Sequence, residues 1–389
     1  MLAVNDSLTA KAARLRLCAT LTFDLKPLMP APDAPTLDTP HHLANQEPVL
    51  ADVARVAKVS TATVSRYLNE PQRVSEKTRA KVRAAIDQLD WVPNAAARSL
   101  VSRRSYTIGA IVPTLEHEKF HQQLQAFQNR LGAQGLAVFV ACSSYDPAEG
   151  YRQARGMLAR GVDALALLGD DYPDALFEQL EAKGTPYVVT FGKRAGSRHP
   201  CAGFDHGQAY AMITRRLLAL GHQRFGIIFQ SVADNGRIHA RLQAVHATLA
   251  EQGLALRPQH QAIRTESLNE GRVAFARASL KHIMSQQPPP TAIICGNDML
   301  AFGALLEAQA LGIAVPGQLS ICGFDDIEIA AHSHPALTTV RVPDRQIGEM
   351  AAQYLIERLA GRACDGPPML EVQLIERGST GIAPTPTLS

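Results

Sequence analysis

The sequence lacks any uninterrupted run of the roughly 18 apolar residues that a membrane-spanning helix needs, because Asp, Arg, Gly or Pro breaks every candidate. We therefore expect no membrane association. Cysteine is also scarce, and the six cysteines contain no CxxC pair and no Cys/His zinc spacing, so neither a disulfide framework nor a structural metal is expected. This usage favours the reducing cytoplasm. The six are Cys18, Cys142, Cys201, Cys295, Cys322 and Cys364.

Recognisable catalytic motifs are absent as well. The chain contains no GxSxG, no HExxH, no phosphate-binding P-loop and no GxGxxG after an expected strand. We therefore predict a protein that is not an enzyme and that has no catalytic residues, no metal ligands and no cofactor.

Charge is distributed unevenly along the 389 residues, although the net charge is only +3. Residues 48–105 contain eleven Lys and Arg against five Asp and Glu, which gives +6 there and leaves −3 for the remainder. With 46% hydrophobic and 19% charged residues, most of the chain should fold, into two or three domains. A compact basic module joined to a mildly acidic body is typical of a polyanion binder with a second function.

The chain divides by composition and periodicity into five parts. Residues 1–46 are rich in proline and without sustained periodicity, which predicts a disordered extension. A short apolar patch from Leu17 resembles a secretion signal faintly, but Asp24 and Lys26 interrupt it. The other parts are a helical head at 47–93, a hinge and linker at 94–105, a body at 106–380 and a tail at 381–389.

Three short helices are predicted in the head. Apolar residues recur at helical spacing from Leu50 to Ala57, and Ser60 and Ser75 are good N-caps for the next two helices. The second should bury Val64 and either Tyr67 or Leu68. The third should carry one apolar stripe, formed by Val82, Ala85, Ile86 and Leu89.

Alternating strands and helices are predicted in the body. Seven β-type runs are separated by helical stretches, which implies parallel sheets with helices on both faces. Similar Gly-Phe-Asp segments occur at Gly203 and Gly323, so we predict two half-domains, with chain crossings near 205 and 326 and a ligand cleft at the strand ends. The runs are Thr107–Val112, Leu136–Ala141, Ala164–Leu168, Tyr187–Phe191, Phe225–Phe229, Ala292–Cys295 and Leu319–Phe324.

The stretch from Leu50 to Leu100 resembles the DNA-binding head of the lactose/galactose repressor (LacI/GalR) family. Small, turn and apolar residues fall where a helix-turn-helix needs them, and Val92-Pro93-Asn94 followed by Leu100 matches the family's hinge. The body to about Thr380 resembles the family's bilobal, periplasmic-binding-protein-like effector domain. PVLADVA, from Pro48, and the Gly-Phe-Asp segment are most similar to the gluconate-type repressors. The expected fold is an all-α helix-turn-helix head followed by an α/β body of two parallel, doubly wound subdomains.

The second head helix, from Thr61 to Asn69, should present its first residues to base edges in the major groove. Thr61 can hydrogen-bond, Ala62 offers apolar contact, and Arg66 reaches either guanine or a phosphate. Lys58 occupies the turn position where the family favours Gly, which costs roughly 1–2 kcal/mol if the residue is left-handed. The residues expected to contact phosphates or cap helices are Ser60, Ser65, Asn69, Arg73, Ser75 and Thr78.

The resemblance implies a hinge helix that folds only on DNA. Residues 95–101 form at most two turns, well below the about 12–15 residues of a marginally stable isolated helix. Leu100 either wedges into a central base step, paired with its copy in a dimer, or packs on the body. The DNA-contacting residues implied here are Asn94, Ala97, Arg98 and Leu100.

The resemblance also implies an effector site in the cleft. Arg241 sits where the family carries an arginine that pairs with the effector, and Asp298 either accepts hydrogen bonds from ligand hydroxyls, caps the following helix, or does both. Phe120 either stacks on the ligand or packs in the core. Phe191 and Glu266 depart from the family's usual acidic and aromatic residues, so a standard hexose is less expected than a sugar acid.

Together these features predict a cytoplasmic, homodimeric transcriptional regulator, most simply a repressor. It would bind a pseudo-palindromic, double-stranded operator and respond to a small sugar, sugar acid or similar metabolite. The alternative is a periplasmic-type sugar-binding protein without DNA function. The sequence names neither the effector, the direction of its effect, nor the operator.

Overall fold

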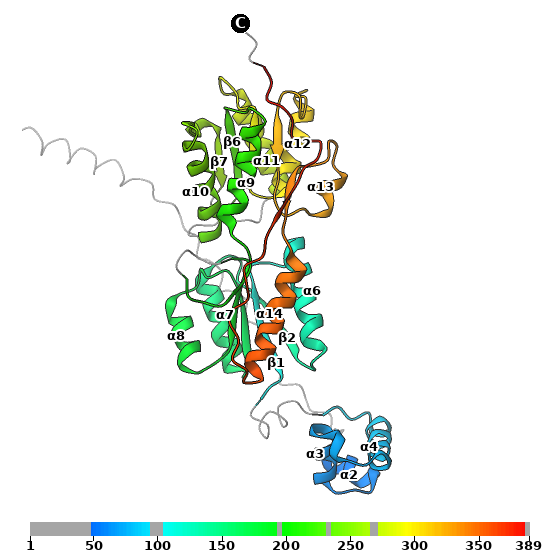
Figure 1. The fold of residues 1–389 in the computed structure, drawn as a ribbon. Helices are drawn as coiled ribbons and strands as arrows, with labels where there is room; N and C mark the ends of the chain where they lie inside the picture. The colour runs from blue at the N-terminus through cyan, green and yellow to red at the C-terminus, as the bar shows by residue number, and fades with distance from the viewer. Residues whose placement is uncertain (1–47, 94–103, 193–196, 231–234, 265–270, 386–389) are drawn as a thin grey trace, which may run out of the picture. The chain divides into compact units, whose positions relative to one another are not determined.

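The computed structural model describes residues 48–93, 104–192, 197–230, 235–264 and 271–385 (Figure 1). The chain divides into two compact units at Pro93, a head and a body. The predicted disordered extension at 1–46 and the predicted hinge helix lie outside the described residues. Within the described ranges, no helix is both long and apolar enough to cross a membrane.

The head consists of three α-helices, α2 (Leu50–Ala57), α3 (Thr61–Asn69) and α4 (Glu76–Leu89), with a short 3₁₀ turn η1 (Pro71–Arg73) before α4. Both predicted caps are confirmed: the Ser60 and Ser75 hydroxyls accept from the amides three residues ahead, at 3.2 and 3.3 Å. The chain turns between α2 and α3 at Lys58, which has the expected left-handed conformation with φ 53° and ψ 47°.

The head has a small core in which all three helices meet. Val64 is fully buried, as expected, and Val82 and Ala85 are buried on α4. Ile86 and Leu89, predicted in the same stripe, are only partly buried. The protein's single tryptophan, Trp91, closes the core after α4. The buried apolar residues of this cluster are Val53, Ala54, Ala57, Val64, Val82, Ala85 and Trp91.

The first lobe of the body, the N-lobe, is built on a parallel five-stranded sheet in the order β2-β1-β3-β4-β5. Alternate residues of β1 face opposite ways, so that Ile108 packs toward α6 and α14, and Ile111 toward α7 and α8. The elements are β1 (Thr107–Val112), α6 (Glu118–Gly132), β2 (Ala137–Cys142), α7 (Pro147–Ala159), β3 (Ala164–Leu168), α8 (Asp174–Ala182), β4 (Tyr187–Thr190), β5 (Cys201–Ala202) and α14 (Asp344–Leu359).

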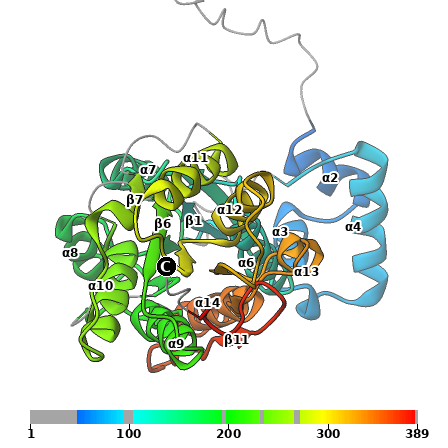
Figure 2. The ribbon, with the colours of Figure 1, turned by 90° about the horizontal axis from the view of Figure 1, so that it is seen from above.

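The second lobe, the C-lobe, has a parallel four-stranded sheet in the order β7-β6-β8-β9. Helices α9 and α10 cover one face, and α11 and α12 cover the other, with α13 against α12 (Figure 2). The elements are α9 (His206–Ala219), β6 (Phe225–Gln230), α10 (Gly236–Ala250), η2 (Pro258–His260), β7 (Gln261–Arg264), α11 (Arg272–Ser285), β8 (Ala292–Cys295), α12 (Asp298–Ala310), β9 (Ser320–Cys322) and α13 (Glu328–His332).

The chain passes between the lobes three times. The first crossing lies between Ala202 and His206. The second follows β10 (Thr339–Arg341) and leads into α14, later than the predicted position near 326, because α13 intervenes and packs on the C-lobe. The third is the C-terminal segment with β11 (Gln373–Ile375), antiparallel to β10 and visible in red in Figure 1. The expected fold class, a helix-turn-helix head and a bilobal α/β body, is confirmed.

Candidate functional site

The exposed face of α3 carries the residues predicted to read bases. Thr61, Ala62 and Arg66 are exposed, while Val64 points into the head core. The first turn of α3 therefore presents a hydroxyl, a methyl group and a guanidinium to solvent on a helix of the width that the major groove accepts.

The predicted phosphate contacts flank that face at the helix ends. Asn69 donates from Nδ2 to the Ser65 carbonyl at 3.0 Å, and the exposed Arg73 pairs with Glu70 at 2.9 Å. Ser60 caps α3, and Thr78 contacts the cap of α4 through its hydroxyl at 2.9 Å. The remaining predicted DNA contacts, Asn94, Ala97, Arg98 and Leu100, lie outside the described residues.

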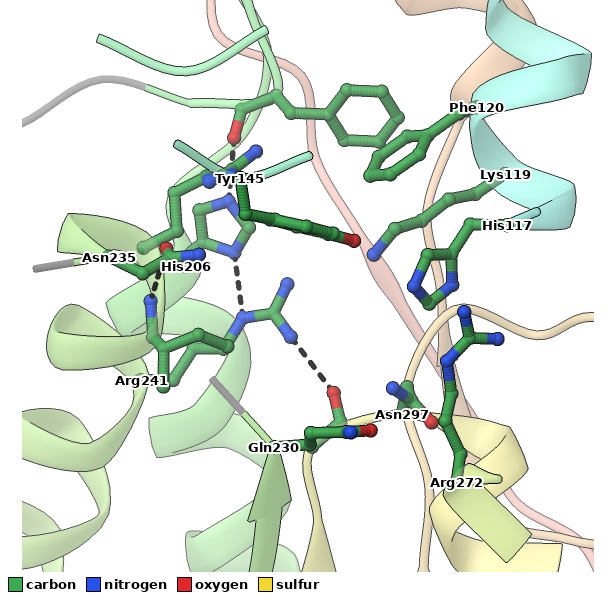
Figure 3. Close-up of a pocket in the computed structure, with 14 residues that line it drawn as sticks. His117, Lys119, Phe120, Tyr145, His206, Gln230, Asn235, Arg241, Arg272 and Asn297 are labelled. Carbon is green, nitrogen blue, oxygen red and sulfur yellow. Dashed lines mark hydrogen bonds between the residues drawn. The ribbon is translucent and has the colours of Figure 1, made fainter. Parts of the chain in front are cut away.

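A second site occupies the cleft between the lobes of the body, as a cavity of about 60 Å³ (Figure 3). The N-lobe contributes the start of α6, Tyr145 and Phe191, and the C-lobe contributes the starts of α9, α10, α11 and α12 and the end of β6. The lining residues are His117, Lys119, Phe120, Tyr145, Phe191, His206, Gln230, Asn235, Arg237, Ile238, Arg241, Arg272, Gly296 and Asn297.

Arg241 lies in this cavity and is only 4% exposed. Its Nη1 donates to the Gly296 carbonyl at 2.9 Å, and its guanidinium carbon lies 4.2 Å from the centre of the Phe324 ring. No carboxylate pairs with Arg241 among the described residues. The guanidinium is therefore held by carbonyl and aromatic groups, and its positive charge stays available to a ligand.

His206 connects Arg241 to the opposite lobe. Arg241 donates from Nε to His206 Nδ1 at 3.0 Å, so the ring proton must lie on Nε2, which donates to the Phe191 carbonyl at 2.6 Å (Figure 3). Burial, and then the nearby Arg241 charge, lower the pKa of His206 well below its ordinary value. The neutral imidazole of His206 thus joins the Phe191 carbonyl, after β4 of the N-lobe, to Arg241 of the C-lobe through two hydrogen bonds.

Lys119 makes a second contact between the lobes. Its ammonium group, on α6, lies 2.9 Å from a carboxylate oxygen of Asp325, in the segment after β9. Both side chains are largely buried, and Lys119 also lies 5.3 Å from the ring centre of Phe120. Burial lowers the pKa of Lys119, while Asp325 acts in the opposite direction.

Two further lining groups are uncharged hydrogen-bonding partners near neutral pH. Burial, with the charges of Lys119 and Arg272, lowers the pKa of His117 to about 2. Burial raises the pKa of Tyr145 to about 12. The cavity thus offers an imidazole and a phenol beside its cationic groups.

The predicted effector residues are only partly brought together. Phe120, Phe191 and Arg241 line the cavity, and the two phenylalanine rings meet edge to face at 5.4 Å. Glu266 lies outside the described residues. Asp298 lies apart from the lining.

The surroundings of Asp298 explain that difference. It is fully buried, and its carboxylate accepts from Thr339 Oγ1 at 2.6 Å and from the Ile327 amide at 3.0 Å. The cap of α12 is the preceding residue, Asn297, whose Oδ1 accepts from the Leu300 amide at 3.0 Å. Asp298 therefore ties α12 to β10 and to the segment before α13. The expected helix cap is corrected, because Asn297 caps α12, whereas the expected ligand contact of Asp298 stays a prediction.

Several lining residues were missing from the sequence predictions. Gln230 follows a predicted strand directly, and Asn297 follows another after one glycine. The carboxyl ends of parallel strands are where such sheets bind ligands. Their position after predicted strands could therefore have identified Gln230 and Asn297 as ligand-site candidates. Lys119, Arg237 and Arg272 lie on helix starts that only the folded chain brings together, so spacing alone did not identify them.

Comparisons with known proteins cover both units. Residues 49–94 match bacterial regulatory proteins of the lacI family, and residues 214–380 match a periplasmic binding protein-like domain. The chain is 32% identical over 344 residues to the HTH-type transcriptional repressor PurR of Proteus mirabilis (strain HI4320), covering 86% of this chain and 97% of that repressor.

Solved structures of related regulators also match most of this chain. A LacI-family transcriptional regulator from Silicibacter pomeroyi matches with a TM-score of 0.77 and 26% identity, over 86% of this chain and 99% of that one. The Lac repressor dimer bound to operator and the anti-inducer ONPF matches with a TM-score of 0.73 and 27% identity, over 86% of this chain and 100% of that one. This chain therefore belongs to the lacI family of bacterial regulatory proteins, which are ligand-responsive, DNA-binding transcriptional regulators.

Proposed function

We propose that this regulator is a cytoplasmic repressor that binds a pseudo-palindromic operator as a homodimer and is switched by a small sugar, sugar acid or similar metabolite. It is not an enzyme, and its relatives are transcriptional repressors. The observation that carries the proposal is the exposure of Thr61, Ala62 and Arg66 on one face of α3.

These three side chains contact base edges, and Arg66 reaches guanine O6 and N7. Such a bidentate contact is worth about 1–3 kcal/mol of discrimination between bases. The side chains at the helix ends contact phosphates and set the register on the duplex. The proposed phosphate contacts are Ser60, Ser65, Asn69, Arg73 and Thr78.

The edge of the N-lobe sheet supports the homodimer. β2 is an edge strand on which Phe139 is 53% exposed and Val140 is 36% exposed. Exposed apolar edge strands favour pairing with another chain, and a second copy would cover this one. One head reads only a few base pairs, so a two-fold operator needs a two-fold protein.

The cleft supports the response to an effector. Phe120 and Phe191 give it an apolar wall, and Arg241 gives it a buried cation without a carboxylate partner among the described residues. A ligand bound there contacts both lobes, so binding biases their relative position and thereby the DNA-binding state. Four cysteines of the described residues, Cys142, Cys295, Cys322 and Cys364, are free thiols, which suits the cytoplasm.

A gel-shift assay with promoter fragments tests the proposal. Binding should weaken steeply as salt rises, because phosphate contacts release counterions. Arg66→Ala should reduce the preference among operator variants more than it reduces binding to random DNA. Arg73→Ala, the matched control, should weaken both equally. Equal losses for Arg66→Ala would make it a phosphate contact, and no retention of any promoter DNA would refute the function.

A further inference from the structure

The cleft contains buried polar groups that no described residue satisfies. Gln230, at the end of β6, is only 8% exposed, yet neither its amide nitrogen nor its amide oxygen has a partner among the described residues. Arg272 Nε is unpartnered in the same sense. Buried polar groups are nearly always hydrogen-bonded, so two such groups lining one cavity indicate a missing ligand with both donors and acceptors.

The charge of the lining indicates the sign of that ligand. Four cations line the cavity, Lys119, Arg237, Arg241 and Arg272, whereas its described lining contains no Asp or Glu. Three of them have acidic neighbours elsewhere: Asp325 at 2.9 Å for Lys119, Asp171 at 4.0 Å for Arg237, and Glu116 at 3.6 Å for Arg272. The Glu116 side chain is 79% exposed, so its pair with Arg272 is weak.

Helix geometry adds to this positive potential. The starts of α6, α10, α11 and α12 all contribute lining residues, and the amino ends of helices carry partial positive charge from their unpaired amide groups. Arg241, with no carboxylate partner among the described residues, is the most costly of these charges to leave unpaired inside the protein.

An adjoining cavity of about 30 Å³ has a different character. It shares Tyr145, Asn235 and Arg237 with the first cavity, so these three side chains border both cavities. Its other lining groups include Asp146 and Asp171, whose carboxylates accept hydrogen bonds. Asp171 Oδ1 accepts from the Gly236 amide at 3.0 Å, and Oδ2 lies 4.0 Å from Arg237 Nε, which is beyond hydrogen-bond distance, so Oδ2 can still accept from a hydroxyl donor.

We infer that the effector is a small, hydroxyl-bearing organic oxyanion, a carboxylate or a phosphate, bound in one orientation. Its charged group lies against Arg241 and Arg272, a neighbouring hydroxyl pairs with Gln230, and its far hydroxyls reach toward Asp171. This inference rests on the proposed effector response and restricts it to anions. Neutral sugars would leave the buried Arg241 charge uncompensated and would leave Arg272 with only its weak pair to the exposed Glu116.

Binding to the full chain tests the inference by isothermal titration calorimetry. The probes are glucose, gluconate, glucose 6-phosphate and 6-phosphogluconate, with the galactose and mannose equivalents, inorganic phosphate and the corresponding alditols. At least one organic oxyanion should bind, and its neutral counterpart should not. Comparison of the carboxylate with the phosphate identifies which anion the site takes.

Two variants locate the charged group and its neighbour. Arg272→Gln should weaken binding of the oxyanion by about tenfold or more, since a charge-assisted hydrogen bond is lost. Gln230→Leu should also weaken it, while raising the melting temperature of the ligand-free protein, because an unsatisfied amide is removed. Arg215→Gln removes one exposed charge on α9, outside the cavity, and should change affinity by less than about twofold.

Each other outcome overturns the inference. Equal binding of neutral and anionic probes does so, as does a panel in which no organic oxyanion binds. Inorganic phosphate that binds alone and is unaffected by Arg272→Gln would indicate nonspecific anion binding only. Promoter retention by the same preparation separates the two levels: retained promoter without oxyanion binding refutes this inference alone, whereas no retention refutes the proposed function.

Discussion

The head and the body place their functional side chains in opposite environments. In the head, Thr61, Ala62 and Arg66 are exposed on α3, above a core of seven buried apolar residues. In the body, Arg241 is 4% exposed and is fixed by contacts to Gly296 and His206. Surface substitutions in the head should therefore alter recognition without altering stability, whereas substitutions in the cleft should alter both.

The largest expected effect is the unfolding of the head while the body stays folded. Val64→Asp places a carboxylate in the small head core and should destabilise it by about 3 kcal/mol or more, which exceeds what so small a unit can tolerate. Operator binding should disappear, while the melting transition of the body is retained in calorimetry. Ala84→Asp, at an exposed position of α4, should preserve operator binding. Operator binding by Val64→Asp would contradict the separation of the two units.

The next effect concerns the cleft. Arg241→Met preserves much of the side-chain volume but leaves the Gly296 carbonyl and His206 Nδ1 without their donor. This loss should lower the free energy of unfolding of the body by about 1–3 kcal/mol, an effect that removal of the unpaired charge partly offsets. The ligand-induced rise in melting temperature should also be lost. The control Lys281→Met, on the exposed side of α11, should show neither change. An unchanged ligand response would exclude Arg241 from the effector site.

A pH-dependent effect on stability should appear in the body at Asp344. Burial, and then Asp325, raise the pKa of Asp344 well above its ordinary value of 3.8, although Lys119 acts in the opposite direction. The folded chain therefore binds a proton at this carboxyl that the unfolded chain has released, so stability falls as pH rises above about 4. Asp344→Asn should flatten this dependence and be more stable than wild type at alkaline pH. The measurement is the free energy of unfolding of both proteins by denaturant at several pH values. The same dependence on pH in wild type and in Asp344→Asn would contradict the prediction.

The smallest effect concerns the turn of the head. Lys58 has φ 53°, a conformation in which glycine avoids about 1–2 kcal/mol of strain but loses part of that gain through a more flexible unfolded chain. Lys58→Gly should stabilise the head by up to about 1 kcal/mol in thermal denaturation. Lys81→Gly, inside α4, should destabilise it by about 1 kcal/mol. If Lys58→Gly and Lys81→Gly both destabilise the head, the left-handed turn at Lys58 is not strained.

Local signals predicted most of the fold. Continuous apolar runs identified β1, β3 and β8 with their observed ends, because strands buried on both faces need such runs. β7 reads Gln-Ala-Ile-Arg and β5 spans only Cys201–Ala202, so neither carries a periodic signal. The short strands β10 and β11 owe their pairing to the third chain crossing, which depends on tertiary structure.

The cleft was less predictable than the head. The exposed face of α3 follows from helical periodicity around the buried Val64, and this signal is local. The cleft depends on which helix starts converge, and the sequence does not contain that information in any one segment. Asp298 shows the difference: its place after β8 predicted a ligand contact, but its carboxylate turns toward Thr339 and Ile327.

The second chain crossing has a consequence for how the protein is made. Helix α14 packs against α6 and completes one face of the N-lobe sheet, yet the ribosome delivers it only after the entire C-lobe sheet has been synthesised. Until then, strands β4 and β5 and the inner face of α6 lack their covering helix. The lobe that begins first is thus finished last, and nascent chains should depend on chaperone protection until residue 359 has emerged.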